Sequence, residues 1–301
     1  MPPITPNRIV ILAFVLILAV WGLATCGEPS PFNVTEVWSR DGFATPESAL
    51  YDEERDVTYV SLMDGGAIEK NGKGRIVVID EQGKTLRTLA EGLNAPKGMA
   101  LYQNTLYVSD IDRIAVIDVD DGTTTFVAVA DSMFLNDVEV DTRGLVYVSD
   151  MLTGIIHTLP HGKGVASLGA LPPTFIAHPN GLFWDGETLI IASWGMPLND
   201  DFTTDQPGRL YRYDPRNDNV TILSERFGNL DGIAVDEEGH MLITDWINGG
   251  LFAYVDGTIE ELIDLPSGSA DLGYHRRGDF FIIPLMKDDR LVALKVEENL
   301  D

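Results

Sequence analysis

Six short segments of the chain carry a polar residue at the same place and could together hold a metal ion. The polar residues are Glu47, Lys97, Asn136, Asn180, Asp231 and Asp271. Five of the six are carboxylates or amides, whose hard oxygen donors suit calcium or magnesium, and none is a His or Cys that would suggest zinc. Three acids and one lysine sum to a formal charge of −2, which a bound divalent cation would neutralise. The alternative is that these residues merely line a wet channel.

The spacing of the six segments indicates a repeated β-sheet unit. Successive polar residues are 50, 39, 44, 51 and 40 positions apart. Each segment leads through a turn into a second apolar run, such as Val146–Ser149, and then into a third run, such as Arg75–Ile79. A fourth and more polar run, such as Val220–Leu223, closes most repeats. Four short strands at this period are typical of a β-propeller, so we expect an all-β, six-bladed β-propeller over residues 32–301.

The two ends of the repeated region are expected to share one blade. The sixth repeat ends after its third run at about Val296, whereas Val34–Trp38 precedes the first repeat and resembles a fourth strand. We therefore expect the N-terminal strand to complete the last blade, which removes open sheet edges.

The propeller fold decides which side chains meet. The first strand of each blade lies nearest the axis, so the six polar residues should lie at one level around one end of the channel. The second strands should end beside this ring and form an apolar rim, as expected of a small-molecule site. The rim residues are Met63, Ile111, Met151, Trp194, Trp246 and Leu285. The long loops Asp64–Gly74 and Gly195–Pro207 either fold over the opening or are merely solvated.

The composition and the N-terminal segment restrict the partners. The chain has 47 acidic and 21 basic residues and a formal charge of −26, which disfavours nucleic acid and anionic lipid. Residues 1–26 differ from the rest: Ile9–Thr25 is uncharged, and Cys26 is the single cysteine. The segment is either a signal peptide, of the lipoprotein type ending at Cys26 or of the ordinary type, or an N-terminal membrane anchor. Each alternative exports the folded part. The expected location is the cell envelope, where the protein is lipid-anchored or membrane-tethered on the periplasmic or extracellular face and contacts the membrane only through this segment.

The polar segments resemble those of the SMP-30/gluconolactonase/regucalcin family of calcium-dependent six-bladed propellers, with diisopropyl fluorophosphatase and the paraoxonases as more distant relatives. The resemblance rests on Pro46-Glu47, Asn136-Asp137, Pro179-Asn180-Gly181-Leu182 and Leu230-Asp231-Gly232, and it extends over nearly all of residues 32–301. It implies one Ca²⁺ held by Glu47, Asn180 and Asp231, with Asn136 contributing directly or through the substrate. It also implies a catalytic role for Asp231, with Asp271 as a second candidate. The substrate would lie against Asn136, Met151, Trp194 and Trp246.

The implied function is an exported, calcium-dependent hydrolase of a small-molecule lactone or ester. The alternative is a non-catalytic propeller that binds a ligand or a protein and uses the cation only to stiffen the channel. Two residues depart from the family pattern: Phe134 stands where sugar lactonases have an arginine, and Lys97 is part of the ring. The first departure favours a more apolar substrate than gluconolactone, and the second either tightens the site or competes with the cation.

Two other sets of residues are candidates for a structural or a functional role. His178 and His275 are candidate bases, although a lone histidine is more often structural. Asp110, Asp150 and Asp245 recur after the second strand, which indicates a repeated turn-capping role.

Overall fold

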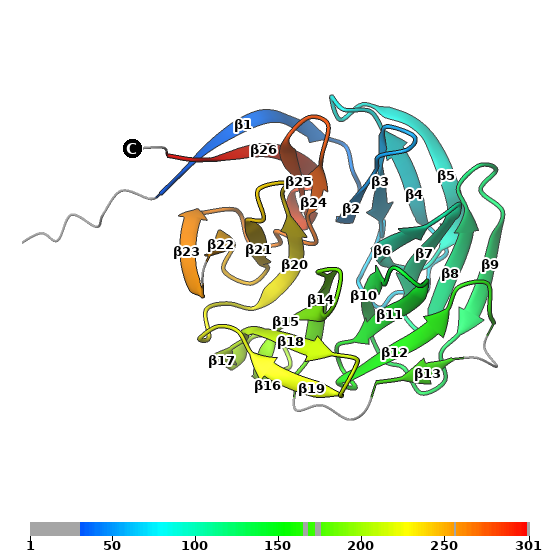
Figure 1. Cartoon of the computed structure of the whole chain (residues 1–301). Helices are drawn as coiled ribbons and strands as arrows, with labels where there is room; N and C mark the ends of the chain where they lie inside the picture. Colours follow the sequence, from blue (N-terminus) through cyan, green and yellow to red (C-terminus); the bar gives the residue numbers. More distant parts are fainter. Residues whose placement is uncertain (1–30, 165–167, 172–175, 256, 300–301) are drawn as a thin grey trace, which may run out of the picture.

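The computed structural model describes residues 31–164, 168–171, 176–255 and 257–299. Within this part of the chain the strands form six four-stranded antiparallel sheets and one two-stranded sheet. The six larger sheets are arranged around a central axis as the blades of a propeller (Figure 1). The prediction of an all-β, six-bladed propeller is therefore confirmed. Residues 1–30, including Ile9–Thr25 and Cys26, lie outside the described residues, and no described helix has the length and apolarity to cross a membrane.

The strands follow one another from the axis outwards in each blade. Blade 1 contains β2 (Pro46–Asp52), β3 (Val57–Leu62), β4 (Gly74–Ile79) and β5 (Thr85–Leu93). Blade 2 contains β6 (Pro96–Tyr102), β7 (Thr105–Asp110), β8 (Arg113–Asp118) and β9 (Thr124–Ala128). Blade 3 contains β10 (Leu135–Val140), β11 (Leu145–Asp150), β12 (Ile155–Pro160) and β13 (Gly169–Ala170).

The second half of the chain repeats this order with one insertion. Blade 4 contains β14 (Pro179–Trp184), β15 (Leu189–Ser193), β18 (Leu210–Asp214) and β19 (Asn219–Ile222). The inserted hairpin consists of β16 (Gly195–Leu198) and β17 (Thr204–Pro207). Blade 5 contains β20 (Leu230–Val235), β21 (Met241–Asp245), β22 (Leu251–Val255) and β23 (Thr258–Ile263). Blade 6 contains β24 (Gly273–His275), β25 (Phe280–Leu285), a short 3-10 helix η2 (Met286–Asp288), and β26 (Arg290–Glu298).

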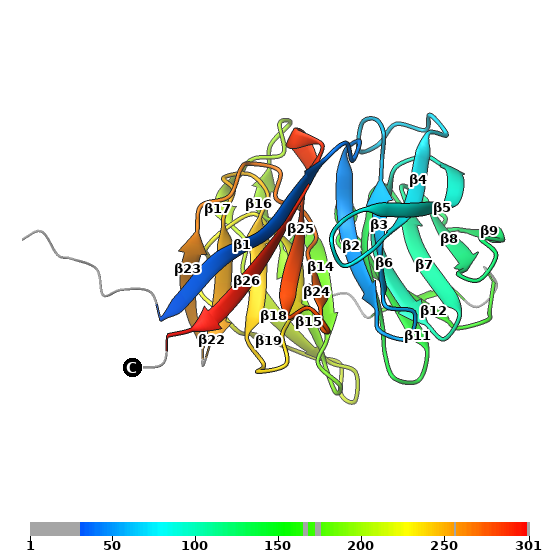
Figure 2. The same ribbon diagram turned by 90° about the horizontal axis from the view of Figure 1, so that it is seen from above.

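The chain closes its own ring through the outermost strand of blade 6. That strand is β1 (Phe32–Asp41), which pairs antiparallel with β26 from Phe32 opposite Glu298 to Asp41 opposite Arg290. Figure 2 shows the two strands side by side along the edge of the molecule. On the axis, Ser48 and Asp271 form a parallel bridge between the innermost strands of blades 1 and 6. The prediction that the N-terminal strand completes the last blade is confirmed.

Most of the hydrophobic core lies between neighbouring blades. Between blades 1 and 2, for example, the buried Tyr59 and Ile76 belong to the same cluster as Met99 and Val108. A blade is therefore covered on both faces, which explains why second strands such as Leu145–Asp150 are buried almost throughout and show no polar face.

A repeated hydroxyl group joins neighbouring blades beside the axis. In blades 1 to 5 a β-bulge immediately follows the first residue of the innermost strand. In blade 5, Thr244 Oγ1 accepts a hydrogen bond from the backbone N of Gly232 in the bulge (3.0 Å) and donates one to the carbonyl of Ala270 in blade 6 (3.0 Å). Ser149 forms the same pair of bonds with Asp137 and Asn180. These hydroxyl groups therefore fix the strand ends on which the polar ring residues stand.

We predict that Thr244→Val destabilises the protein by about 2 kcal/mol, because it leaves two buried backbone groups without a partner while conserving the side-chain shape. Thr244→Ser keeps the hydroxyl group and should cost less than about 1 kcal/mol. Urea denaturation followed by tryptophan fluorescence would measure both. Equal losses of free energy in the two variants would show that the hydroxyl group does not join the blades.

Candidate metal and substrate site

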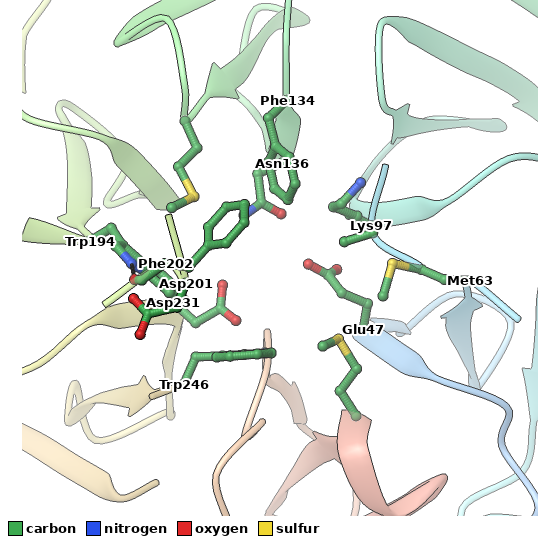
Figure 3. A pocket seen from close by; sticks show the side chains of 13 residues that line it. Glu47, Met63, Lys97, Phe134, Asn136, Trp194, Asp201, Phe202, Asp231 and Trp246 are labelled. Atoms are coloured by element: carbon green, nitrogen blue, oxygen red, sulfur yellow. Dashed lines mark hydrogen bonds between the residues drawn. The ribbon is translucent and has the colours of Figure 1, made fainter. Parts of the chain in front are cut away.

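A pocket of about 140 Å³ opens at the end of the channel where the innermost strands begin. Figure 3 shows polar side chains at its floor and methionine and aromatic side chains around them. The polar residues that line the floor are Glu47, Lys97, Asn136 and Asp231. The apolar residues are Met63, Ala67, Phe134, Met151, Trp194, Phe202, Trp246 and Met286, and Asp201 lies at the edge. A mostly apolar wall around a few converging polar groups is the usual form of a small-molecule site.

The four residues predicted to hold a cation are brought together at this floor. Asn180 is fully buried behind the pocket surface and links two others. Its Nδ2 donates to Asp231 Oδ1 (2.7 Å) and to the carbonyl of Leu230 (3.0 Å), and its Oδ1 accepts from Asn136 Nδ2. The carboxamide oxygen of Asn136 and the carboxylate of Glu47 face each other in Figure 3. Each of the four is the second residue of an innermost strand, namely β2, β10, β14 or β20.

The two carboxylates at the floor are electrostatically unfavourable without a cation. Burial raises the pKa of Glu47 well above its usual range, and the charges of Asp231 and Asp271 raise it further. Burial, with a contribution from Asp271, raises the pKa of Asp231 to about 8. Glu47 Oε2 is buried and has no hydrogen-bond partner among the described residues. Buried carboxylate oxygens without a donor are what a cation site requires, so these residues fit a divalent cation with oxygen ligands.

Asp271 is not part of this floor, and the prediction that it shares the level of the other ring residues is wrong. In blades 1 to 5 the residue before the ring position pairs with the end of the second strand, as Leu230 pairs with Asp245. In blade 6 the matching bridge joins Ser269 to Leu285, so Ala270 occupies the ring position. Asp271 therefore lies one residue further along the strand, where it accepts a hydrogen bond from Ser48 Oγ (2.5 Å) and lines a separate cavity of about 270 Å³.

The same one-residue shift explains a second error in blade 6. Leu285 was expected at the pocket rim, but the pocket is lined by its neighbour Met286. The apolar pattern Phe280–Ile283 indicates a strand without fixing its register, since every side chain in it is buried. Ala270 carries no polar signal, so the sequence alone favours the adjacent acid, Asp271, at this position.

The other rim predictions are largely correct. Met63, Met151, Trp194 and Trp246 line the pocket, whereas Ile111 packs against Met63 in a small cluster beside it. Both long loops reach the opening: Ala67 comes from the first, and Asp201 and Phe202 come from the tip of the β16–β17 hairpin. The indole of Trp194 donates to the carbonyl of Phe202 (2.7 Å) and holds the tip in place. The sequence did not single out Asp201 or Phe202, because nothing in a turn sequence tells which residue points inward.

Lys97 and Phe134, the two departures from the family pattern, contact each other. Lys97 Nζ lies 4.6 Å from the centroid of the Phe134 ring and donates a hydrogen bond to the carbonyl of Ala95 (3.1 Å). Burial lowers the pKa of Lys97 to about 8, while the charges of Glu47 and Asp110 act in the opposite direction. Among the described residues no carboxylate oxygen lies within 4.0 Å of Nζ, so Lys97 does not form an ion pair with a ring acid.

The two histidines predicted as candidate bases do not line the pocket. His178 Nδ1 lies 2.8 Å from the carbonyl of Met151, and His275 is buried between Tyr51 and Phe280. The capping role predicted for the repeated aspartates is confirmed. Asp150, for example, accepts hydrogen bonds from the backbone N atoms of Met133 and Phe134 just before β10.

Comparisons with known proteins find similarity in structure only. No protein-family model matches the chain, and no curated protein matches it by sequence. Among solved structures, a gluconolactonase from Xanthomonas campestris has a TM-score of 0.64 at 18% identity, covering 88% of this chain and 89% of that chain. A putative gluconolactonase has a TM-score of 0.63 at 17% identity, covering 89% and 93%.

A third similar structure is an inactive variant of virginiamycin B lyase from Staphylococcus aureus with quinupristin. Its TM-score is 0.59 at 14% identity, covering 88% of this chain and 99% of that chain. The TM-scores establish the fold. At identities this low, the reaction has to be inferred from the residues of the site. The chain is a six-bladed β-propeller that resembles gluconolactonases in fold.

Proposed function

We propose that the protein is a calcium-dependent hydrolase of a lactone or ester, with the cation held by Glu47, Asn136, Asn180 and Asp231. The observation that carries this proposal is the position of Glu47 at the floor of an apolar pocket beside Asp231. Glu47 is a buried carboxylate, and one of its oxygens has no hydrogen-bond partner in the described part of the chain. The similarity in fold to a gluconolactonase supports the same reaction class. When bound there, a divalent cation would polarise the carbonyl oxygen of the ester group.

In this mechanism Asp231 acts as the general base. Asn180 donates to Asp231 Oδ1, which orients the carboxylate and leaves Oδ2 available to accept a proton from water. The water oxygen bonds to the ester carbonyl carbon, the bond from that carbon to the alkoxy oxygen breaks, and the leaving alkoxide takes a proton back from Asp231. Met151, Trp194 and Trp246 enclose the acyl part and exclude other water molecules. Asp271 has no part in this mechanism because it does not line the pocket.

We predict that the metal-stripped protein binds one Ca²⁺ in calorimetric titration and that Glu47→Gln and Asp231→Asn lose this binding, because each replaces a charged ligand by a neutral one of similar shape. Asp271→Asn is the matched control, since it removes a buried carboxylate outside the floor and should keep the binding site. Loss of calcium binding in Asp271→Asn alone would move the proposed site to the other cavity.

Calcium affinity should rise by about tenfold per pH unit for each displaced proton as the pH rises from 6 towards 8, and should level off above the pKa of Asp231. The reason is that the pKa of Asp231 is raised from 3.8 to about 8, so this group is largely protonated below pH 8 when no cation is bound. Titrations in buffers of different ionisation enthalpy would report the released protons. A pH-independent affinity would contradict the proposed ligands.

The same raised pKa governs the stability of the metal-free protein. A carboxyl group whose folded pKa is raised contributes its full stability below pH 3.8 and loses it as the pH rises to about 8. We therefore expect the thermal midpoint of the metal-free protein to fall between pH 5 and pH 8. The midpoint of the calcium-loaded protein should fall less, because the cation compensates the charge. If the thermal midpoints of the two forms fell equally with pH, the cation would have to bind elsewhere.

A panel of lactones and esters tests catalysis. Asp231→Asn should lower kcat by about 10²-fold or more, because it removes the proposed general base and also a charged ligand of the cation. Calcium binding by the wild type without turnover of any substrate in the panel would favour the non-catalytic alternative, in which the cation only stiffens the channel.

A further inference from the structure

Lys97 is a buried cation without a carboxylate partner among the residues that the structure describes. Its side chain is 1% exposed, yet it lines the pocket. Nζ donates one hydrogen bond, to the carbonyl of Ala95, and its other contact is the face of the Phe134 ring. An ammonium group has three donors, so at least one has no acceptor among the described residues. A charge in this state is costly unless something else compensates it.

The nearest acids do not fill this role. Asp110, which acts electrostatically on Lys97, forms an ion pair with Arg113 (2.7 Å) and accepts from the backbone N atoms of Asn94 and Ala95. Glu47 also acts on Lys97 electrostatically but lies beyond ion-pair distance. In the proposed function Glu47 is committed to the cation. The pocket floor therefore contains two carboxylates, a divalent cation and one ammonium group, which is one positive charge in excess at the floor. The third acid of the pocket, Asp201, is exposed to solvent at its edge and accepts hydrogen bonds from the backbone N (3.1 Å) and the hydroxyl group (2.6 Å) of Thr203.

We propose that Lys97 binds a carboxylate carried by the substrate, so that the substrate is a lactone or ester with a free carboxylate. This inference rests on the proposed function, because the excess of positive charge arises when the cation is bound. The carboxylate would take the unused donor of Nζ, while the rest of the acyl part contacts the methionine and aromatic wall. Figure 3 shows the amine nitrogen of Lys97 at the edge of the pocket, beside the Phe134 ring.

The test compares a γ-lactone that carries a carboxylate with its carboxamide analogue. The wild type should hydrolyse the carboxylate form with a kcat/KM about 10- to 100-fold higher, the range expected for a charge-assisted hydrogen bond. In Lys97→Met this ratio should fall to about one, and in Lys97→Arg much of it should remain. A wild-type ratio of one, or a ratio unchanged in Lys97→Met, would overturn the proposal.

The chain offers a matched control in Lys287. Its Nζ lies 4.0 Å from the centroid of the Trp246 ring, so it also stacks on an aromatic residue of the pocket, but it is exposed and donates to Ser267 Oγ. Lys287→Met should leave the ratio of the two rates at the wild-type value. An equal drop in Lys287→Met and Lys97→Met would mean that general surface charge attracts the anion, which would contradict a specific role for Lys97.

A binding measurement separates this inference from the proposed hydrolysis. Phenylacetate and phenylacetamide are titrated into the calcium-loaded and the metal-free protein. Tighter binding of phenylacetate that is lost in Lys97→Met supports the inference even if no lactone is hydrolysed, in which case only the proposed reaction fails. Should Lys97→Met not fold, as judged by near-ultraviolet circular dichroism, Lys97→Gln replaces it in both experiments. Equal binding of the two probes by the wild type would overturn the inference.

Discussion

The whole site depends on how closely the six innermost strands approach one another at the axis. A Cβ atom at Gly181 would lie 1.9 Å from the carbonyl oxygen of Asp231 in the next blade, and one at Gly232 would lie 2.6 Å from the Cα of Asp271. Only glycine allows blades 4, 5 and 6 to stand at this distance. The residues just before these glycines, Asn180 and Asp231, are thereby held within hydrogen-bond distance of each other. The close approach of backbones is thus what assembles the floor of the pocket.

That arrangement places like charges together at an energetic cost. Asp231 and Asp271 raise the pKa of Glu47, Asp271 also raises that of Asp231, and burial is the largest cause of the shift in all three groups. Hydrophobic burial between the blades, together with hydrogen bonds from hydroxyl groups such as that of Ser149, offsets this cost. The residues that stabilise a blade and the residues that form the site therefore occupy different parts of it. The outer strands of a blade supply the packing, and in blades 1 to 5 the second residue of the innermost strand supplies the polar or charged group of the site.

The sequence predicted the architecture well because a propeller repeats its signals. Six similar segments determine the blade number, and the alternation of apolar runs and turns determines the strands. Prediction failed where the repeat is irregular. In blade 6, Pro284 replaces the hydroxyl residue found near the end of most second strands, and Ala270 replaces the polar ring residue. The predicted alignment of blade 6 with the other blades was therefore wrong by one residue. The contact of Lys97 with Phe134 was also beyond sequence analysis, because it depends on the direction of two side chains from adjacent blades.

The pairing of β1 with β26 also determines how the molecule would respond to force. Phe32 lies opposite Glu298, so the two ends of the described chain leave the same blade side by side. Tension applied between these ends would act on one residue pair at a time and peel the strands apart from Phe32 towards Asp41. Strands loaded in shear would have to break many hydrogen bonds at once. Tension in this direction would therefore remove β1 from blade 6 first and so release the strand that closes the ring, while β24, β25 and β26 stay paired.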